Sequence, residues 1–277
     1  NAVIYANSVL GARSVKHPDF LDLFIALTGR APRAGVYLPQ NRRPQITIAV
    51  NLPANHDESL WPLLGWCAGK LSPDSIPRLI GLETANPTED DLRALCAAFG
   101  TTSAAPMLHV AGITPEGDLA PAPTAPKHKI TAKDLATAWN TFNAGPPAID
   151  LVALGSPHFS LTELRQFAAL MAGKTCHENT ACIITLSRET RAAATNLIPT
   201  LTDAGVQLVT DLCWCSITEP VFPPTAKTLM TNSGKYAHYA PGLSGRATRF
   251  GSLSDCAQAA QTGTAPIAPP PWLHPAK

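Results

Sequence analysis

Residues 231–245 form the stretch of this chain with the densest set of reactive side chains. The stretch combines hydroxyls, an amide, a cation, a titratable imidazole and two phenols. These side chains belong to Thr231, Asn232, Ser233, Lys235, Tyr236, His238 and Tyr239. Glycines within the stretch let the backbone bend or approach a ligand closely. The residue types indicate a ligand-binding loop, and they fit an ordinary surface loop equally well.

Polar clusters also follow three apolar runs, 149–154, 181–186 and 206–210, which we predict to be parallel strands. The carboxyl ends of parallel strands meet at one edge of a sheet, where α/β proteins bind ligands. Ser187 and Arg188 would start a helix at that edge, a combination that suits a carboxylate or a phosphate. They also fit a plain N-cap followed by a solvated arginine. Cys213 follows the third run.

A weaker cluster follows the apolar run 2–6, which we also predict to be a strand. Asn7, Ser8 and Arg13 can all be directed at an oxyanion, and Gly11 permits a close turn. The chain begins at Asn1 and enters this run at once, as if inside a strand, so we expect an N-terminal part to be missing.

The order of the elements predicts an α/β fold with parallel sheets covered by helices. Further buried strands are expected at 46–50, 77–82 and 106–111, and helices at 88–99, 131–142, 160–172 and 188–204. The proline-rich stretch 112–130 indicates a loop or an interdomain connection. We therefore expect two α/β subdomains, 1–142 and 143–277, the second ending in a proline-rich extended tail.

The composition excludes several classes of protein. Charged residues make up only 15% of the chain and the net charge is +1, which gives no support for binding nucleic acid or an anionic membrane. No apolar run is long enough for a membrane-spanning helix, and we expect a cytoplasmic protein. Seven cysteines, an odd number, argue against a disulfide framework. Dispersed cysteines remain compatible with a metal cluster assembled in three dimensions.

Several phrases, in this order along the chain, resemble the aconitase X family. They are Ala6–Arg13, Pro157–Ser160, Ser187-Arg188, Asp211–Trp214, Met230–Gly242 and Phe250–Cys256. The resemblance implies an aconitase-like architecture and dehydration of a small hydroxy acid at an iron–sulfur cluster, of the two-iron or four-iron type. Bacterial members are similar to cis-3-hydroxy-L-proline dehydratases, which form Δ1-pyrroline-2-carboxylate. Archaeal members act on mevalonate 5-phosphate.

The resemblance also implies which residues form the site. Cys213 and Cys256 match two of the three cluster ligands, and the third would precede Asn1. A small swivelling domain or subunit is expected as a partner, so the chain alone is expected to be inactive. Lys235 and His238 are the candidate catalytic residues. The candidate substrate-binding residues are Asn7, Ser8, Arg13, Ser187, Arg188, Thr231, Asn232, Ser233 and Tyr239.

Two departures from the family pattern lie beside the expected cluster: Leu212 replaces the usual threonine, and Cys215 is additional. Neither removes a ligand. Cis-3-hydroxy-L-proline is the favoured substrate, because mevalonate 5-phosphate would call for additional lysines or arginines. The alternatives are a mevalonate 5-phosphate dehydratase and, in another class, a non-catalytic binding subunit.

Overall fold

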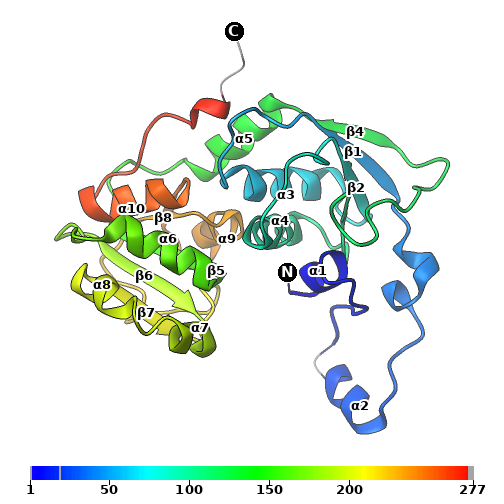
Figure 1. The fold of residues 1–277 in the computed structure, drawn as a ribbon, viewed down its shortest axis with the longest axis horizontal. Helices are drawn as coiled ribbons and strands as arrows, with labels where there is room; N and C mark the ends of the chain where they lie inside the picture. Colours follow the sequence, from blue (N-terminus) through cyan, green and yellow to red (C-terminus); the bar gives the residue numbers. More distant parts are fainter. Residues whose placement is uncertain (1, 19, 274–277) are drawn as a thin grey trace.

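The computed structural model describes residues 2–18 and 20–273, and it contains two parallel β-sheets flanked by helices (Figure 1). The first sheet has the order β3-β2-β1-β4, and the second has the order β7-β6-β5-β8-β9. The first contains β1 (Ile46–Val50), β2 (Pro77–Ile80), β3 (His109–Val110) and β4 (Lys127–Ile130). The second contains β5 (Leu151–Phe159), β6 (Ala181–Leu186), β7 (Val206–Thr210), β8 (Thr228–Thr231) and β9 (Ala247–Phe250). The expected fold class is confirmed.

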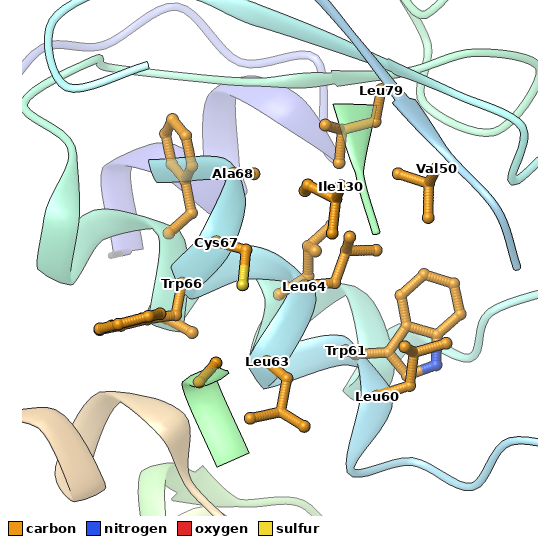
Figure 2. Packing of buried hydrophobic residues seen from close by; sticks show 14 of the residues in the cluster. Val50, Leu60, Trp61, Leu63, Leu64, Trp66, Cys67, Ala68, Leu79 and Ile130 are labelled. Carbon is orange, nitrogen blue, oxygen red and sulfur yellow. The ribbon is translucent and has the colours of Figure 1, made fainter. Parts of the chain in front are cut away.

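The first sheet packs against helix α3 (Leu60–Leu71). Figure 2 shows its apolar side chains gathered beside Val50, Leu79 and Ile130 of the strands. The next helix, α4 (Glu89–Thr102), lies against α3 at very short range. A Cβ atom at Gly65 would lie 2.2 Å from the Leu95 carbonyl oxygen, so only glycine allows this approach. Helix α5 (Ala132–Phe142) completes this part of the core.

The second sheet is covered on both faces. Val152 and Leu154 of β5 pack with α6 (Leu161–Met171), α8 (Ile198–Asp203) and α10 (Leu253–Thr262). The alternate residues Leu151 and Ala153 pack with α9 (Gly234–Ser244) and with Trp214. Strand side chains alternate between faces, so each face of the sheet receives its own apolar set.

The hydrophobic core of the first sheet extends to the second subdomain. Ala237 of α9 and Phe250 of β9 belong to the same buried cluster as α3 and α4, and the rings of Trp139 and Phe250 lie 5.7 Å apart. All strands of the first sheet precede residue 143, and all strands of the second follow it. We keep 1–142 and 143–277 as proposed subdomains, joined by this core.

Four helices begin with a reciprocal capping box, in which the N-cap hydroxyl and the acidic N3 side chain each bind the other residue's backbone N–H. The pairs are Thr88 with Asp91, Thr131 with Asp134, Ser160 with Glu163, and Ser252 with Asp255. The predicted helices at 88–99, 131–142 and 160–172 are confirmed as α4, α5 and α6.

The expected strand at 2–6 is wrong, because these residues form helix α1 (Ala2–Ser8). A short apolar run does not distinguish a buried helix from a strand. Residues 188–204 form two helices, α7 (Arg188–Ala193) and α8, rather than one. Pro199 lies in the first turn of α8, where proline is tolerated, although it cannot continue a preceding helix.

Three further expectations need correction. Stretch 112–130 is not an interdomain connection, since it joins β3 to β4 within the first sheet. Stretch 231–245 is not a loop, because β8 ends at Thr231 and α9 begins at Gly234. The strand at 106–111 is reduced to His109–Val110. Residues 274–277 of the expected extended tail lie outside the described residues.

Helix α2 (Leu21–Thr28) buries none of its residues and lies away from both sheets (Figure 1). Among the helices that the structure describes, none is long and apolar enough to span a membrane.

Candidate functional site

The carboxyl edge of the second sheet faces α4 of the first subdomain, and two adjoining cavities lie there. The smaller, about 30 Å³, is lined by Ser156 and His158 of β5, Arg93 of α4 and the start of α9. The larger, about 170 Å³, is lined by Glu58, Asp91 and Leu253, among others. Asp90, Ala94, Glu163 and Asn232 line both. We call these two cavities together the chamber.

An unusual backbone at Gly155 shapes the chamber wall. Gly155 has φ +96°, and a Cβ atom there would lie 2.0 Å from the Thr185 carbonyl oxygen. The pairing of β5 with β6 shifts register between Leu154 and Phe159. This irregularity carries Ser156, Pro157 and His158 past the regular sheet and into contact with α4.

Hydrogen bonds join the two subdomains beside the chamber. Arg93 donates to Asp90 at 2.9 Å and to the His158 carbonyl oxygen at 2.8 Å. The Ser160 hydroxyl donates to the other Asp90 oxygen at 2.7 Å. These bonds fix α4 against the end of β5 and the start of α6.

Two carboxyl groups line the chamber, that of the partly buried Glu163 and that of Glu58. Glu163 accepts a hydrogen bond from the Ser160 N–H at 2.9 Å, and Glu58 accepts one from the Leu253 N–H at 2.7 Å. Burial raises the pKa of Glu163 to about 7, and it raises the pKa of Glu58 as well. Desolvation disfavours the charged form, so each carboxyl group would gain from a cationic neighbour.

The start of α9 is built by its own hydroxyl residues. Ser233 is the N-cap: its Oγ accepts from the Tyr236 N–H at 3.1 Å and donates to the Ser156 carbonyl oxygen. The Thr231 Oγ1 accepts from the Ser233 N–H at 3.2 Å. These two predicted substrate-binding residues therefore hold the backbone. Asn232, between them, lines both cavities of the chamber.

Lys235 lies next to Cys213, with Nζ 4.0 Å from the thiol sulfur. Two bonds fix the segment that carries Cys213. His158 Nε2 donates to the Leu212 carbonyl oxygen at 2.9 Å, and the buried Trp214 donates to the Leu154 carbonyl oxygen at 2.7 Å. The first of these bonds connects the Cys213 segment with the chamber wall.

Lys235 and Tyr239 also line a third cavity of about 640 Å³ between α9, the end of α4 and α1. Its wall includes Lys16 and the apolar side of α1. The predicted residues of α9 are thus divided between two places, with Asn232 and Ser233 at the chamber and Tyr239 at the third cavity.

His238 is not among the residues that line these three cavities. Its Nδ1 accepts a hydrogen bond from Trp66 Nε1 at 3.2 Å. Burial, with a smaller effect from Lys70, lowers the His238 pKa, which favours a neutral ring. Because Nδ1 is the acceptor, the proton of the neutral ring lies on Nε2. His238 therefore offers a hydrogen-bond donor rather than a second lone pair.

The N-terminal candidates hold the fold together. The Asn7 side chain donates to the carbonyl oxygens of Ser14 at 2.7 Å and Pro106 at 3.0 Å, and it accepts from the Ser14 N–H at 2.9 Å. Ser8 Oγ accepts from the Leu108 N–H at 2.9 Å. Arg13 lies 3.9 Å from Glu116.

The pair at the end of β6 also has partners within the chain. Ser187 caps α7 through the Thr190 N–H at 3.1 Å. Arg188 donates to Asp211 at 2.6 Å, and this ion pair lowers the pKa of Asp211. The roles of Ser187 and Arg188 in substrate binding stay predictions.

The two candidate metal ligands have different surroundings. Cys213 is exposed, whereas Cys256, in α10, is fully buried, and burial raises its pKa. Within residues 2–18 and 20–273, no three His, Cys, Asp or Glu side chains are grouped so that they could hold a metal. The described residues therefore do not form an iron–sulfur site by themselves, and the cluster stays a prediction.

The sequence analysis did not identify Glu58, Asp90, Arg93 or Glu163 as site residues. Asp90 and Glu163 lie in the first turns of α4 and α6. They are 73 positions apart along the chain, and only the packing of the two subdomains brings them to one chamber. No local pattern could have joined them.

Models of the three aconitase X domains match the chain in succession: the first domain at residues 1–40, the second at 44–140 and the third at 149–262. The chain belongs to the aconitase X family. The Thermococcus kodakaraensis aconitase X structure, in its holo-form, superposes with a TM-score of 0.82 at 26% identity, over 94% of this chain and 66% of that one. Both the two-sheet fold and the domain order are thus those of aconitase X.

Curated relatives fall into two groups. The cis-3-hydroxy-L-proline dehydratases of Pseudomonas aeruginosa and Hypocrea jecorina are 48% and 45% identical over 99% and 95% of this chain. The phosphomevalonate dehydratase large subunit of Methanosarcina mazei is 32% identical over 95% of the chain and 63% of its own length. The chain spans about half the length of the first two relatives, 48% and 46%.

Proposed function

We propose that this aconitase X chain is part of a hydro-lyase that dehydrates cis-3-hydroxy-L-proline. The observation that carries the proposal is the difference in identity between the two groups of relatives. Relatives named as cis-3-hydroxy-L-proline dehydratases are 45–48% identical, and phosphomevalonate dehydratase large subunits are 28–32% identical.

The reaction breaks the C3–O bond and removes the proton from the α-carbon, with loss of water. The resulting enamine tautomerises to Δ1-pyrroline-2-carboxylate. In this proposal the chamber holds the substrate, with Asn232 at its wall, and Lys235 supplies a cation beside it. His238 does not line the chamber, and its catalytic role stays a prediction: as a neutral ring with its proton on Nε2, it can donate a hydrogen bond to a hydroxyl but is not a general acid in that state.

The iron–sulfur cofactor is proposed from the family alone, with Cys213 and Cys256 as its candidate ligands. Cys213, exposed beside Lys235, is accessible to a cluster. Cys256 is fully buried and would have to move. The chemistry that such a cluster supplies is Lewis acidity toward the substrate hydroxyl.

A further domain or subunit is proposed as the partner that completes the site. Several relatives are named as large subunits, which implies that those enzymes have a smaller one. The exposed position of Cys213 and the open third cavity beside Lys235 fit a site that is covered by another part of the enzyme.

A turnover assay on the full-length protein tests the proposal. Purified under anaerobic conditions, it is expected to convert cis-3-hydroxy-L-proline to a product that reacts as a cyclic imine. Mevalonate 5-phosphate, offered in parallel at the same concentration, is expected to remain unchanged. Loss of water from the phosphate and not from the hydroxyproline would reverse the assignment, and inertness toward both would favour the binding-subunit alternative.

A further inference from the structure

Four helices begin at the chamber, and their first turns are not alike. α4, α6, α9 and α10 each contribute residues of the N-terminal turn to its walls or next to them. The start of a helix carries a partial positive charge and unpaired N–H groups, which favour an anion. Four such ends around one space would be costly unless acidic groups compensate them.

Three of the four ends are compensated by acidic side chains of this chain. Asp91 accepts from the backbone at the start of α4, Glu163 does so at α6, and Asp255 at α10. Helix α9 differs. Its first turn contains no acidic residue, and its N3 position is Tyr236. The start of α9 is therefore the end at which an anion from outside the chain would be stabilised.

A buried hydroxyl group marks the same place. Ser156 is 4% exposed, lines the smaller cavity together with Asn232, Ser233 and Gly234, and its Oγ has no hydrogen-bond partner among the described residues. Buried hydroxyls are nearly always paired, because an unpaired one costs about 1–3 kcal/mol. This hydroxyl and the start of α9 together offer hydrogen-bond donors for an anionic group.

A cation site adjoins these donors. Glu163 lines both cavities, and its Oε2 accepts from Ser160 while Oε1 has no hydrogen bond among the described residues. Glu58 lines the larger cavity. Arg93, which lines the smaller cavity, is held by Asp90. Asp90 is thus paired with a cation, whereas Glu58 and Glu163 form no ion pair among the described residues.

We propose that the chamber is a zwitterion site that binds a small α-amino acid, with the carboxylate at Ser156 and the start of α9 and the ammonium group at Glu163. The donor side and the acceptor side share Asn232 and Glu163 as neighbours, which matches the adjacent charges of an α-amino acid. The volumes, about 30 and 170 Å³, suit a ligand of that size. This inference rests on the proposed function and assigns its substrate selectivity: an acidic wall attracts the ring ammonium of a hydroxyproline and repels a phosphate.

Binding of two ring compounds to the full-length protein separates the two halves of the proposal. L-proline carries both charges and has no hydroxyl to lose, and cyclopentanecarboxylate has the same ring size without the amine. Isothermal titration calorimetry is expected to show L-proline binding at least about tenfold more tightly, since hydrogen bonds to charged groups contribute about 1.5–3 kcal/mol.

Two substitutions then act on different ends of the ligand. Ser156→Ala is expected to weaken the binding of both compounds by about tenfold. The melting temperature should stay unchanged or rise, because the removed hydroxyl has no partner. Glu163→Gln keeps the capping box. It is expected to weaken the binding of L-proline by about tenfold and to leave the binding of cyclopentanecarboxylate almost unchanged.

Matched controls have the same chemistry away from the chamber. Ser72→Ala removes a buried hydroxyl that is bonded to the Ala68 carbonyl oxygen, so it should lower stability and leave both dissociation constants unchanged. Asp134→Asn alters a capping-box carboxyl group at α5 and should change neither dissociation constant.

Three results would overturn the inference. The first is unchanged L-proline binding in Ser156→Ala, and the second is equal loss of affinity for both compounds in Glu163→Gln. The third is binding of Mg²⁺ to the chamber without competition from L-proline. Its failure is distinct from failure of the proposed function. A protein that turns over cis-3-hydroxy-L-proline while both variants bind L-proline normally keeps the function and loses the zwitterion site.

Discussion

Two polar clusters of this chain look alike in sequence and differ in the structure. The N-terminal cluster consists of Asn7, Ser8 and the residues that they bind, and the chamber lies between α4, β5, α6 and α9. Every polar atom of the Asn7 and Ser8 side chains that we predicted to face a ligand has a partner within the chain. The chamber instead contains an unpaired buried hydroxyl at Ser156 and carboxyl groups with free oxygens.

The difference shows that residue types identify polar clusters. Which cluster is open to a ligand depends on which of its polar atoms already have hydrogen-bond partners within the chain. A satisfied cluster stabilises the fold, because buried polar groups need partners. A cluster with unpaired buried groups is costly to the free protein and is relieved when a ligand binds. The N-terminal cluster is thus a framework, and the chamber is the candidate site.

The largest stability effect is expected in the framework. Arg42 is fully buried and donates to Glu116 at 2.6 Å, to the Asn7 carbonyl oxygen at 2.9 Å and to the Val36 carbonyl oxygen at 3.2 Å. Arg42→Met should lower the free energy of unfolding by about 3–5 kcal/mol, because it leaves a carboxylate and two carbonyl groups unpaired. Denaturant unfolding measures this loss. A loss below about 1 kcal/mol would contradict the framework role.

A similar effect, dependent on pH, is expected in the chamber. The pKa of Glu163 rises on folding from 4.5 to about 7. Its contribution to stability is therefore greatest below about pH 4.5 and is lost as the pH rises through about 7. The loss should approach about 3 kcal/mol at pH 8. In Glu163→Gln this loss should be absent, so the variant should exceed the wild type in stability at pH 8 but not at pH 4.5.

Equal pH slopes for the wild type and Glu163→Gln would show that Glu163 is not held in a desolvated environment. Asp134→Asn again serves as the control. The capping hydrogen bonds lower the pKa of Asp134, so this variant should lose stability mainly at pH values above the ordinary pKa of an aspartate.

A smaller difference in unfolding free energy is expected between substitutions of two asparagines, Asn7 and Asn232. Asn7→Ala should cost about 2 kcal/mol of unfolding free energy, since three buried hydrogen bonds are lost. Asn232 makes no side-chain hydrogen bond among the described residues and is not fully buried, so Asn232→Ala should cost less than about 0.5 kcal/mol. Thermal unfolding followed by circular dichroism measures both. A reversal of this order would remove the distinction between framework and chamber.

The sequence predicted the parts of the fold that have strong local signals. The runs that became β5 and β6 are mostly apolar and buried, as central parallel strands are. Helix α3 went unpredicted because Pro62, Gly65 and Gly69 lower its intrinsic propensity. In the structure Pro62 lies in the first turn, and the glycines permit contact with α4. Tertiary packing therefore outweighed local preference.

The candidate site was predictable only in part, for the same reason. The phrase at 231–245 and Cys213 were found from residue types and resemblance, and both lie at the expected edge of the second sheet. Asp90, Arg93 and Glu163 were not found, because they meet only when the two subdomains pack together. The helix at 234–244 was missed since Asn-Ser-Gly and Pro241 are typical of loops.

The most direct test is the kcat/KM for cis-3-hydroxy-L-proline in the full-length Asn7→Ala and Asn232→Ala variants, at a temperature where both are folded. We predict turnover by the wild type, near-wild-type kcat/KM in Asn7→Ala, and a loss of at least about tenfold in Asn232→Ala. Turnover that is absent in the wild type, or a loss in Asn7→Ala as large as that in Asn232→Ala, would contradict the account.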